Sequence, residues 1–147
     1  MVHDIALSAA VAGFRDVVLM GDHGEGQDVL AAVAKELDAS WRPKGVRVFY
    51  IPDLYYKAKQ QARAYEAAHG ITHDEHAGTD DTSELMAIDS QHIWIRPGKI
   101  VRGGPVQFGT IGVNGDPTRA SATLGRIFLG YKIDAAVAQI RSLVGPR

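Results

Sequence analysis

Two short apolar runs in the first third of the chain predict buried strands. Residues 16–20 read DVVLM and residues 46–51 read VRVFYI, so both are rich in the β-branched and aromatic residues that strands favour. Apolar residues recur at helical spacing over residues 27–39 and predict a helix, and a further helical stretch covers residues 54–69. An alanine-rich helix over residues 5–12 is expected before the first strand. This alternation of strands and helices predicts an α/β fold with a parallel sheet.

The second half of the chain has a less regular pattern. A short helix is predicted over residues 82–88, because Thr and Ser residues favour helix starts. Trp94 stands between two isoleucines, a pattern typical of a buried strand. Glycines punctuate residues 95–116, which predicts one short strand or an irregular segment that covers a site. The dipeptide Asp116-Pro117 then opens a long amphipathic helix that runs to Val144.

The composition fits one ordinary globular domain over residues 1–147. A formal net charge of -1 provides no electrostatic attraction for nucleic acid or for an anionic membrane surface, so neither partner is expected. The chain has no cysteine, which excludes disulfides and cysteine-rich zinc sites and leaves His, Asp and Glu as candidate metal ligands. The near-apolar stretch at residues 5–14 is too short to span a bilayer and follows no basic segment. We therefore expect a cytoplasmic protein.

Side chains that can bind metals directly follow the first predicted strand. Asp22, His23 and Glu25 lie in a glycine-flanked loop at the carboxyl end of that strand, where open α/β sheets place their sites. An imidazole and a carboxylate two residues apart can bind one cation, because Gly24 and Gly26 permit tight backbone geometry. The same side chains can instead satisfy loop backbone groups or cap the next helix. A phosphate-binding loop is a third interpretation, which the carboxylates and the absence of Lys and Arg from the loop disfavour.

A second group of imidazoles and carboxylates occupies residues 73–76, which read HDEH. These side chains can ligate a metal or transfer protons near neutral pH. The alternative is a solvated polar loop, which suits His73 better than His76, because small residues follow His76 and let the backbone approach a ligand. Asp80 and Asp81 precede the predicted helix, so capping of its N-terminus is their structural interpretation.

Three segments, in order, resemble the motifs of one known family. Residues 21–25 read GDHGE, residues 76–83 read HAGTDDTS, and residues 112–117 read GVNGDP. The creatininase (creatinine amidohydrolase) family commonly shows an NGHGGN-like loop, an HAGExETS-like segment and a GxxGDP-type helix start. The similarity runs over nearly all of this chain. It implies a three-layer α/β/α fold with a mostly parallel sheet.

For function, the resemblance implies metal-dependent hydrolysis of a C–N bond in a small cyclic or linear amide, with one or two ions of zinc or manganese. His23 is similar to the metal-ligating histidine of the first loop, and Glu25 to the acidic residue that creatininase itself carries there. His76 resembles the active-site histidine that transfers protons during the attack. Asp81 stands where the family usually has glutamate, and Thr79 replaces another glutamate whose role as ligand or base a hydroxyl cannot fill. We expect the side chains of His23, Glu25, His76 and Asp81 to converge around a cation.

The resemblance also implies that a part of the family fold is missing. Family members are usually longer, and their first strand carries a Glu-x-His pair followed by a metal-bridging aspartate, so we expect this chain to lack about the first third of the fold. Catalytic zinc normally takes three protein ligands. The chain is then a truncated product, a domain completed by a partner chain, or a noncatalytic scaffold that serves as a binding or oligomerisation module. We expect a homo-oligomer, with candidate contact residues Trp41, Tyr55, Tyr56 and Trp94.

Overall fold

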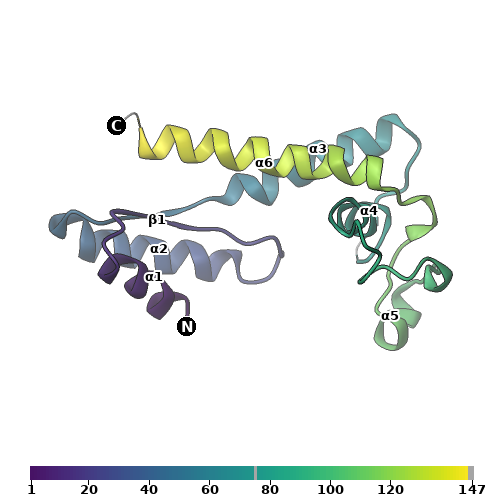
Figure 1. Cartoon of the computed structure of the whole chain (residues 1–147), viewed down its shortest axis with the longest axis horizontal. Coiled ribbons are helices and arrows are strands. Elements are labelled where there is room, and N and C mark those ends of the chain that lie inside the picture. The colour runs from purple at the N-terminus through teal and green to yellow at the C-terminus, as the bar shows by residue number, and fades with distance from the viewer. Residues whose placement is uncertain (75, 146–147) are drawn as a thin grey trace. The chain divides into compact units, whose positions relative to one another are not determined.

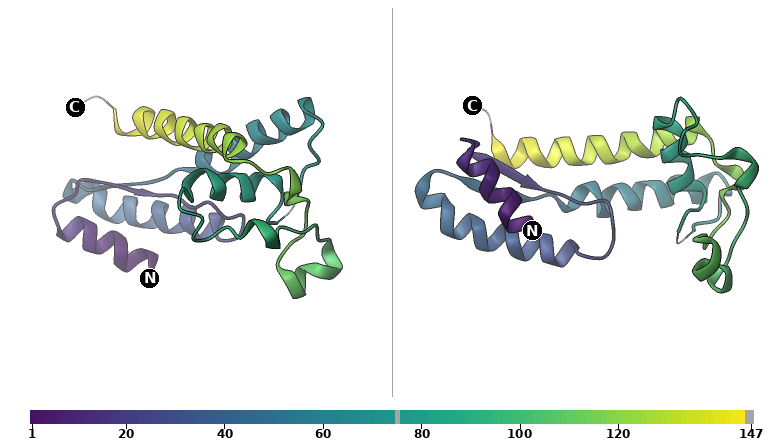
Figure 2. Two further views of the ribbon diagram at one scale, coloured as in Figure 1. Left: turned by 45° about the vertical axis from the view of Figure 1, so that its right-hand side comes forward. Right: turned by 60° about the horizontal axis from the view of Figure 1, so that its bottom comes forward.

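The computed structural model describes residues 1–74 and 76–145, which form two compact units (Figures 1 and 2). Unit 1 consists of Met1–Lys57 together with the chain from Lys132 on, and unit 2 is Ala58–Tyr131. The last helix, α6 (Ala122–Val144), therefore contributes its first part to unit 2 and its last part to unit 1. Within the described chain, no helix is both long enough and apolar enough to cross a lipid bilayer.

A two-stranded parallel sheet forms the centre of unit 1. The strand β1 (Asp16–Leu19) pairs with β2 (Arg47–Tyr50), with Val17 opposite Val48. The crossover that a parallel pair requires is made by α2 (Gln27–Trp41) and the short 3₁₀ turn η1 (Arg42–Lys44). At the first register position, Asp16 and Arg47 form an ion pair of 2.7 Å. The predicted α/β character and the parallel pairing are confirmed.

The core of unit 1 lies where α1 (Val2–Val11) and α2 cover the strands (Figure 1). Val17 and Leu19 of β1 both point into this core, because alternate residues of a strand face the same side. The buried set comprises Ala6, Val17, Leu19, Ala34, Leu37, Val46 and Val48. After β2 and the turn η2 (Pro52–Leu54), the backbone N–H of Asp53 donates to the side chain of Gln139 at 3.0 Å, which attaches the last part of α6.

Unit 2 is built on three helices, α3 (Tyr56–Ala68), α4 (Thr79–Ile88) and the first part of α6. Phe128 of α6 is 1% exposed and meets the ring of Tyr65 edge-on, with 5.8 Å between the ring centroids. Ser83 of α4 is fully buried, and its hydroxyl accepts the backbone N–H of Ser121 at 3.1 Å. A Cβ at Gly125 would overlap the carbonyl oxygen of Ser83, so α4 and α6 meet at a contact that only glycine permits.

The helices and strands predicted for residues 1–70 are all present, with small shifts at their ends, but the prediction for Trp94 was wrong. The carboxylate of Asp89 accepts the backbone N–H groups of Ile93, Trp94 and Ile95 at 2.8, 3.0 and 2.8 Å. These are the groups that a strand would pair along a ladder. Because one side chain binds all three, the segment turns instead, and Trp94 is 61% exposed.

The last helix begins at Ala122 and not, as predicted, at Asp116. The Asp116 side chain caps only the 3₁₀ turn η4 (Pro117–Arg119) by accepting the N–H of Thr118 at 3.0 Å. Ala120 then adopts an extended backbone, which separates that turn from α6. Within residues 95–116 the structure has η3 (Pro97–Lys99) and the helix α5 (Pro105–Ile111), so part of the segment expected to be irregular is helical.

The contact at Gly125 yields a prediction with a matched control in the same helix. We expect Gly125→Ala to lower the free energy of unfolding by about 1–3 kcal/mol, because the new methyl group collides with rigid backbone. Gly130 has nothing within 4 Å of an added Cβ, so Gly130→Ala should stabilise the protein by about 0.5–1 kcal/mol through helix propensity. Urea unfolding of both variants measures the difference. Equal stability of the two variants would show that α4 and α6 do not meet in this way.

Candidate functional site

The loop between β1 and α2 is organised by Gln27, the first residue of α2. Its side chain is 3% exposed, and its Nε2 donates to the carbonyl oxygens of Gly21 at 2.9 Å and of His23 at 2.6 Å. Its Oε1 accepts the hydroxyl proton of Tyr50 at 2.6 Å. One buried amide therefore connects the loop to β2, and sequence reasoning had not singled it out. The available signal was an uncharged polar residue in the first helical turn after a glycine-rich loop.

Two glycines let this loop follow its path. Gly26 takes the left-handed conformation (φ 86°) just before α2. A Cβ at Gly24 would lie 2.8 Å from the hydroxyl of Tyr55, so the tyrosine lies directly against the loop backbone. The Asp22 carboxylate is paired with the ammonium of Lys132 at 2.7 Å and so has a structural partner.

The side chains of His23 and Glu25 are exposed to solvent. They are the two predicted metal ligands, and the loop presents both from a backbone held by Gln27. An imidazole nitrogen and a carboxylate oxygen are donors that zinc and manganese accept. Their role as metal ligands stays a prediction.

The second predicted loop is held by backbone pairing. His76 exchanges two hydrogen bonds with Asn114, N–H to carbonyl at 3.2 and 3.0 Å, and Gly103 does the same with Gly115 at 3.0 Å in both directions. The side chain of His76 is exposed. Glu75, which belongs to the same HDEH run, lies outside the described residues.

Asp74 joins this loop to the turn that precedes α6. Its Oδ2 accepts the backbone N–H of Thr79 at 3.1 Å and that of Asp116 at 2.9 Å. A Cβ at Gly78 or at Gly115 would overlap the Asp74 side chain, which explains both glycines on steric grounds. The carboxylate is therefore a structural acceptor that links the HAG segment (residues 76–78) to the GDP segment (residues 115–117).

Asp81 and Thr79 lie in the first turn of α4. Asp81 does not precede the helix as expected but lies in its first turn, where its Oδ2 accepts the backbone N–H of Ala77 at 2.9 Å, and its catalytic role stays a prediction. Ala77 itself adopts a positive φ of 50°. Thr79 is 1% exposed, and its hydroxyl donates to the carbonyl oxygen of Asp116 at 2.8 Å. At a position where the motif resemblance implies a glutamate, this threonine binds backbone.

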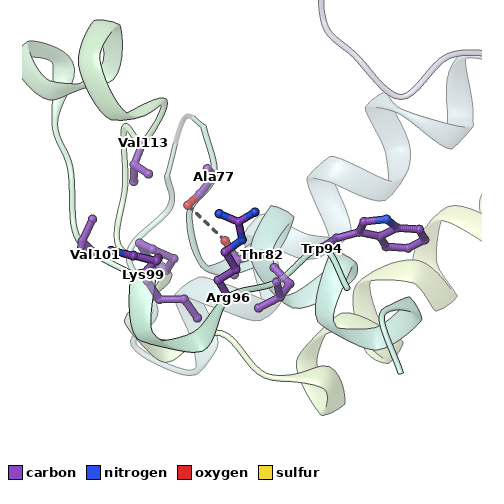
Figure 3. A pocket seen from close by; sticks show the side chains of 10 residues that line it. Ala77, Thr82, Trp94, Arg96, Lys99, Val101 and Val113 are labelled. Atoms are coloured by element: carbon purple, nitrogen blue, oxygen red, sulfur yellow. Dashed lines mark hydrogen bonds between the residues drawn. The ribbon is translucent and has the colours of Figure 1, made fainter. Parts of the chain in front are cut away.

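A cavity of about 350 Å³ lies beside this turn (Figure 3). Ala77 and Thr82 line it, and these are the chain neighbours of His76 and Asp81. In Figure 3 the side chain of Arg96 lies beside Ala77 and Thr82, whereas the indole of Trp94 extends away from them. Most of its wall is apolar, and its lining residues are Ala77, Thr82, Trp94, Ile95, Arg96, Lys99, Ile100, Val101, Val113 and Pro117.

Asp89 binds the backbone of two residues that line this cavity, Trp94 and Ile95. Burial of the Asp89 carboxylate disfavours its charged form, but the donations from Ile95, Ile93 and Trp94 outweigh burial and hold its pKa below the usual value. The stable anion fixes the chain where it passes from α4 to the cavity wall.

A third group of ligand-type side chains in unit 2 was not predicted as a set. Glu66 of α3, His73 of the following loop and Asp80 of α4 each place a donor atom within 4.8 Å of the other two. The Nδ1 of His73 lies 3.2 Å from Oε2 of Glu66, and the Nε of Arg63 lies 3.2 Å from Nε2 of His73. The sequence contained one signal for this group. Glu66 follows Ala58 and Ala62 at intervals of four, which places a carboxylate on the buried face of α3, where an acidic residue is unusual.

The electrostatics of this group are unfavourable for its two carboxylates. Burial raises the pKa of Glu66, and the charge of Asp80 raises it further against the opposing hydrogen bond from His73. Burial likewise raises the pKa of Asp80, with a further contribution from the charge of Asp81. A bound proton or a bound cation would reduce this cost.

The structure thus places the predicted residues in two sets. His23 and Glu25 belong to unit 1, and His76 and Asp81 belong to unit 2. The expected convergence of the four around one cation stays a prediction.

Comparison with known proteins links the chain to one family. The profile of the creatininase family, described as creatinine amidohydrolase, matches residues 1–140. A solved creatininase carrying a tryptophan-to-alanine mutation has the same fold, with a TM-score of 0.70, 21% identity, and coverage of 99% of this chain and 63% of that one. This chain therefore spans less than two thirds of the length of that protein. No curated protein sequence matches it significantly.

The role of Gln27 can be tested by truncation. We expect Gln27→Ala to lower the free energy of unfolding by about 1–3 kcal/mol, because it leaves buried hydrogen-bonding groups without their partner. Hydrogen exchange at the amides of residues 24–26 should become faster in this variant, since the loop loses its attachment. The exposed residue Gln60 on α3 provides the control, and Gln60→Ala should stay within about 0.5 kcal/mol of the original protein. Unchanged exchange in the loop of Gln27→Ala would contradict the assignment.

Proposed function

Because this chain belongs to the creatininase family, we propose that it hydrolyses a C–N bond in a small cyclic or linear amide. The observation that carries the proposal is the family match over residues 1–140, which includes both predicted loops. The fold of a solved creatininase across 99% of the chain supports the same scaffold. The proposal includes the three-layer α/β/α arrangement, of which unit 1 contributes the parallel strands and their covering helices.

The family is metal-dependent, and His23 and Glu25 would hold the metal in this chain. Their donor atoms fit zinc or manganese, and their exposure leaves them accessible to an ion and to further ligands. When bound, the metal supplies an activated water and polarises the amide carbonyl. Two protein donors fall short of the three that catalytic zinc normally has, so the proposal requires at least one donor beyond this pair.

His76 and Asp81 are proposed to manage protons during hydrolysis. An amide nitrogen leaves only after it gains a proton, and a protonated imidazole can deliver it. The isolated β-bridge with Asn114 fixes the backbone of His76, and the N–H of Ala77 binds the carboxylate of Asp81. Both residues therefore start from a defined backbone position, which acid–base catalysis requires.

The cavity beside this turn suits a small substrate. Its volume of about 350 Å³ lies in the range of small-molecule sites, and its largely apolar wall would exclude water from the amide. Arg96 and Lys99 add positive charge to the wall. We propose that this wall binds the part of the substrate that is not cleaved, and that its shape sets the choice of amide.

A noncatalytic scaffold is the second candidate function. The number of donors favours it, since His23 and Glu25 are only two ligands. In that case the fold would serve as a binding or oligomerisation module. We propose that the chain self-associates in both cases: for the amidohydrolase a second copy can supply further metal donors, and for the scaffold oligomerisation would be part of the function.

Activity and metal content separate the roles of the two loops. We expect the full chain, supplied with Zn²⁺ or Mn²⁺, to hydrolyse creatinine or a linear amide. His76→Ala should retain bound metal but lose about 10²–10⁴-fold in kcat, as removal of a general acid does. His23→Ala should lose the metal ion held by His23 and Glu25, and with it the activity, whereas the exposed His3→Ala on α1 should lose neither.

One outcome of that experiment would contradict the role of His23, and another would contradict the amidohydrolase itself. Equal hydrolysis by His23→Ala and by the original chain would remove His23 from the mechanism. A folded chain without metal and without activity towards any amide would favour the scaffold.

Self-association is tested by mass measurement in solution. We expect light scattering on a sizing column to give a multiple of the 15.8 kDa chain mass that falls upon dilution. A single species at the chain mass at every concentration would contradict a homo-oligomer.

A further inference from the structure

We propose that Glu66, His73 and Asp80 form a divalent-cation site in unit 2, separate from the predicted ligands His23 and Glu25. It shares no residue with the proposed amidohydrolase site and does not depend on that activity. The inference concerns binding of the ion, and the three donors come from α3, from the loop after it and from the first turn of α4.

The first argument is geometric. The three donor atoms lie within 4.8 Å of one another. Donors bound to one zinc ion at ordinary bond lengths lie no more than about 4 Å apart, so small rotations of the side chains would bring all three into contact with one ion. One imidazole and two carboxylates are a set that zinc and manganese both accept.

The second argument is an unsatisfied buried atom. Glu66 is 1% exposed, and within the described residues no donor reaches its Oε1, although its Oε2 contacts His73. Buried carboxylate oxygens are almost always paired, because an oxygen that loses its hydrogen bonds to water and gains no new partner destabilises the folded state. A cation among the three donors would provide the missing partner.

An ion would also have a route to this site. His73 is 28% exposed and lines an open cavity of about 410 Å³, whose other walls include Asp74, Arg102 and Asn114. Water from this cavity can complete the coordination sphere, as in sites with three protein ligands. Asp81 and Asp74 lie next to the donors in sequence and add negative charge near the opening.

One contact opposes the ion and makes the proposal specific. The Arg63 side chain donates through Nε to Nε2 of His73 at 3.2 Å, which places the imidazole proton on Nδ1, facing Glu66. An ion bound at Nδ1 displaces that proton to Nε2 and so ends the donation from Arg63. Arg63 is exposed, and its removal should therefore strengthen cation binding without disturbing the core.

The experiment titrates Zn²⁺ alone into the full chain by calorimetry. His23→Ala serves as the background, so that the predicted ligands of unit 1 contribute nothing. We expect one zinc ion per chain in that background. Adding Glu66→Gln should weaken this binding more than tenfold, since it removes a charged ligand while keeping the side-chain shape, and Asp80→Asn should act in the same direction. Adding Arg63→Gln should tighten the binding several-fold.

The exposed Asp134 on α6 supplies the matched control, and Asp134→Asn should leave the zinc affinity unchanged. If Glu66→Gln and Asp80→Asn bind Zn²⁺ as tightly as the background, the site is wrong. Absence of zinc binding in the background would also overturn the proposed cation site, and would indicate that Glu66 and Asp80 are stabilised by a bound proton instead. Loss of amide hydrolysis alone would contradict the proposed function and leave this site intact, because the readout here is binding.

Discussion

The two hydrogen bonds accepted by Asp74 are the constraint on which unit 2 depends. They join the N–H groups of Thr79 and Asp116, 37 residues apart, to one carboxylate oxygen. These groups begin α4 and the turn before α6, where helix starts leave backbone donors without partners. Once they are satisfied by one side chain, the HAG and GDP segments become neighbours. The His76–Asn114 pairing and the cavity beside Ala77 form against that arrangement.

The acidic residues of unit 2 divide into two physical classes. Hydrogen bonds from Thr118 hold the pKa of Asp116 below its usual value, and backbone donors do the same for Asp89, so both carboxylates are stable anions that organise loops. Burial and the charge of a neighbouring carboxylate raise the pKa of Glu66 and of Asp80, whose donor atoms lie together with that of His73. The first class stabilises the fold. In the second class, Oε1 of Glu66 has no hydrogen-bond partner among the described residues, and buried carboxylates with raised pKa values are often found at sites for a proton or an ion.

The candidate chemistry rests on how the loops are supported. In unit 1, Gln27 and Tyr55 fix the backbone that presents His23 and Glu25, so these exposed side chains project from a defined loop. In unit 2, the β-bridge between His76 and Asn114 and the first turn of α4 do the same for His76 and Asp81. The membership in the creatininase family explains why motif residues occur at both places. It does not account for Glu66, which lies outside all three motifs.

The sequence by itself determined the elements of residues 1–70, the parallel pairing of the two strands and the family, because periodicity, β-branched runs and short motifs are local properties. Only the tertiary structure decided what the polar residues do. Trp94 is exposed because Asp89, several residues earlier, binds the amides that a strand would have used. Thr79 and Asp81 proved to bind backbone at a helix start. Glu66, His73 and Asp80 became a group only when a helix, a loop and a second helix packed together, since donors close in space and distant in sequence leave no local pattern to read.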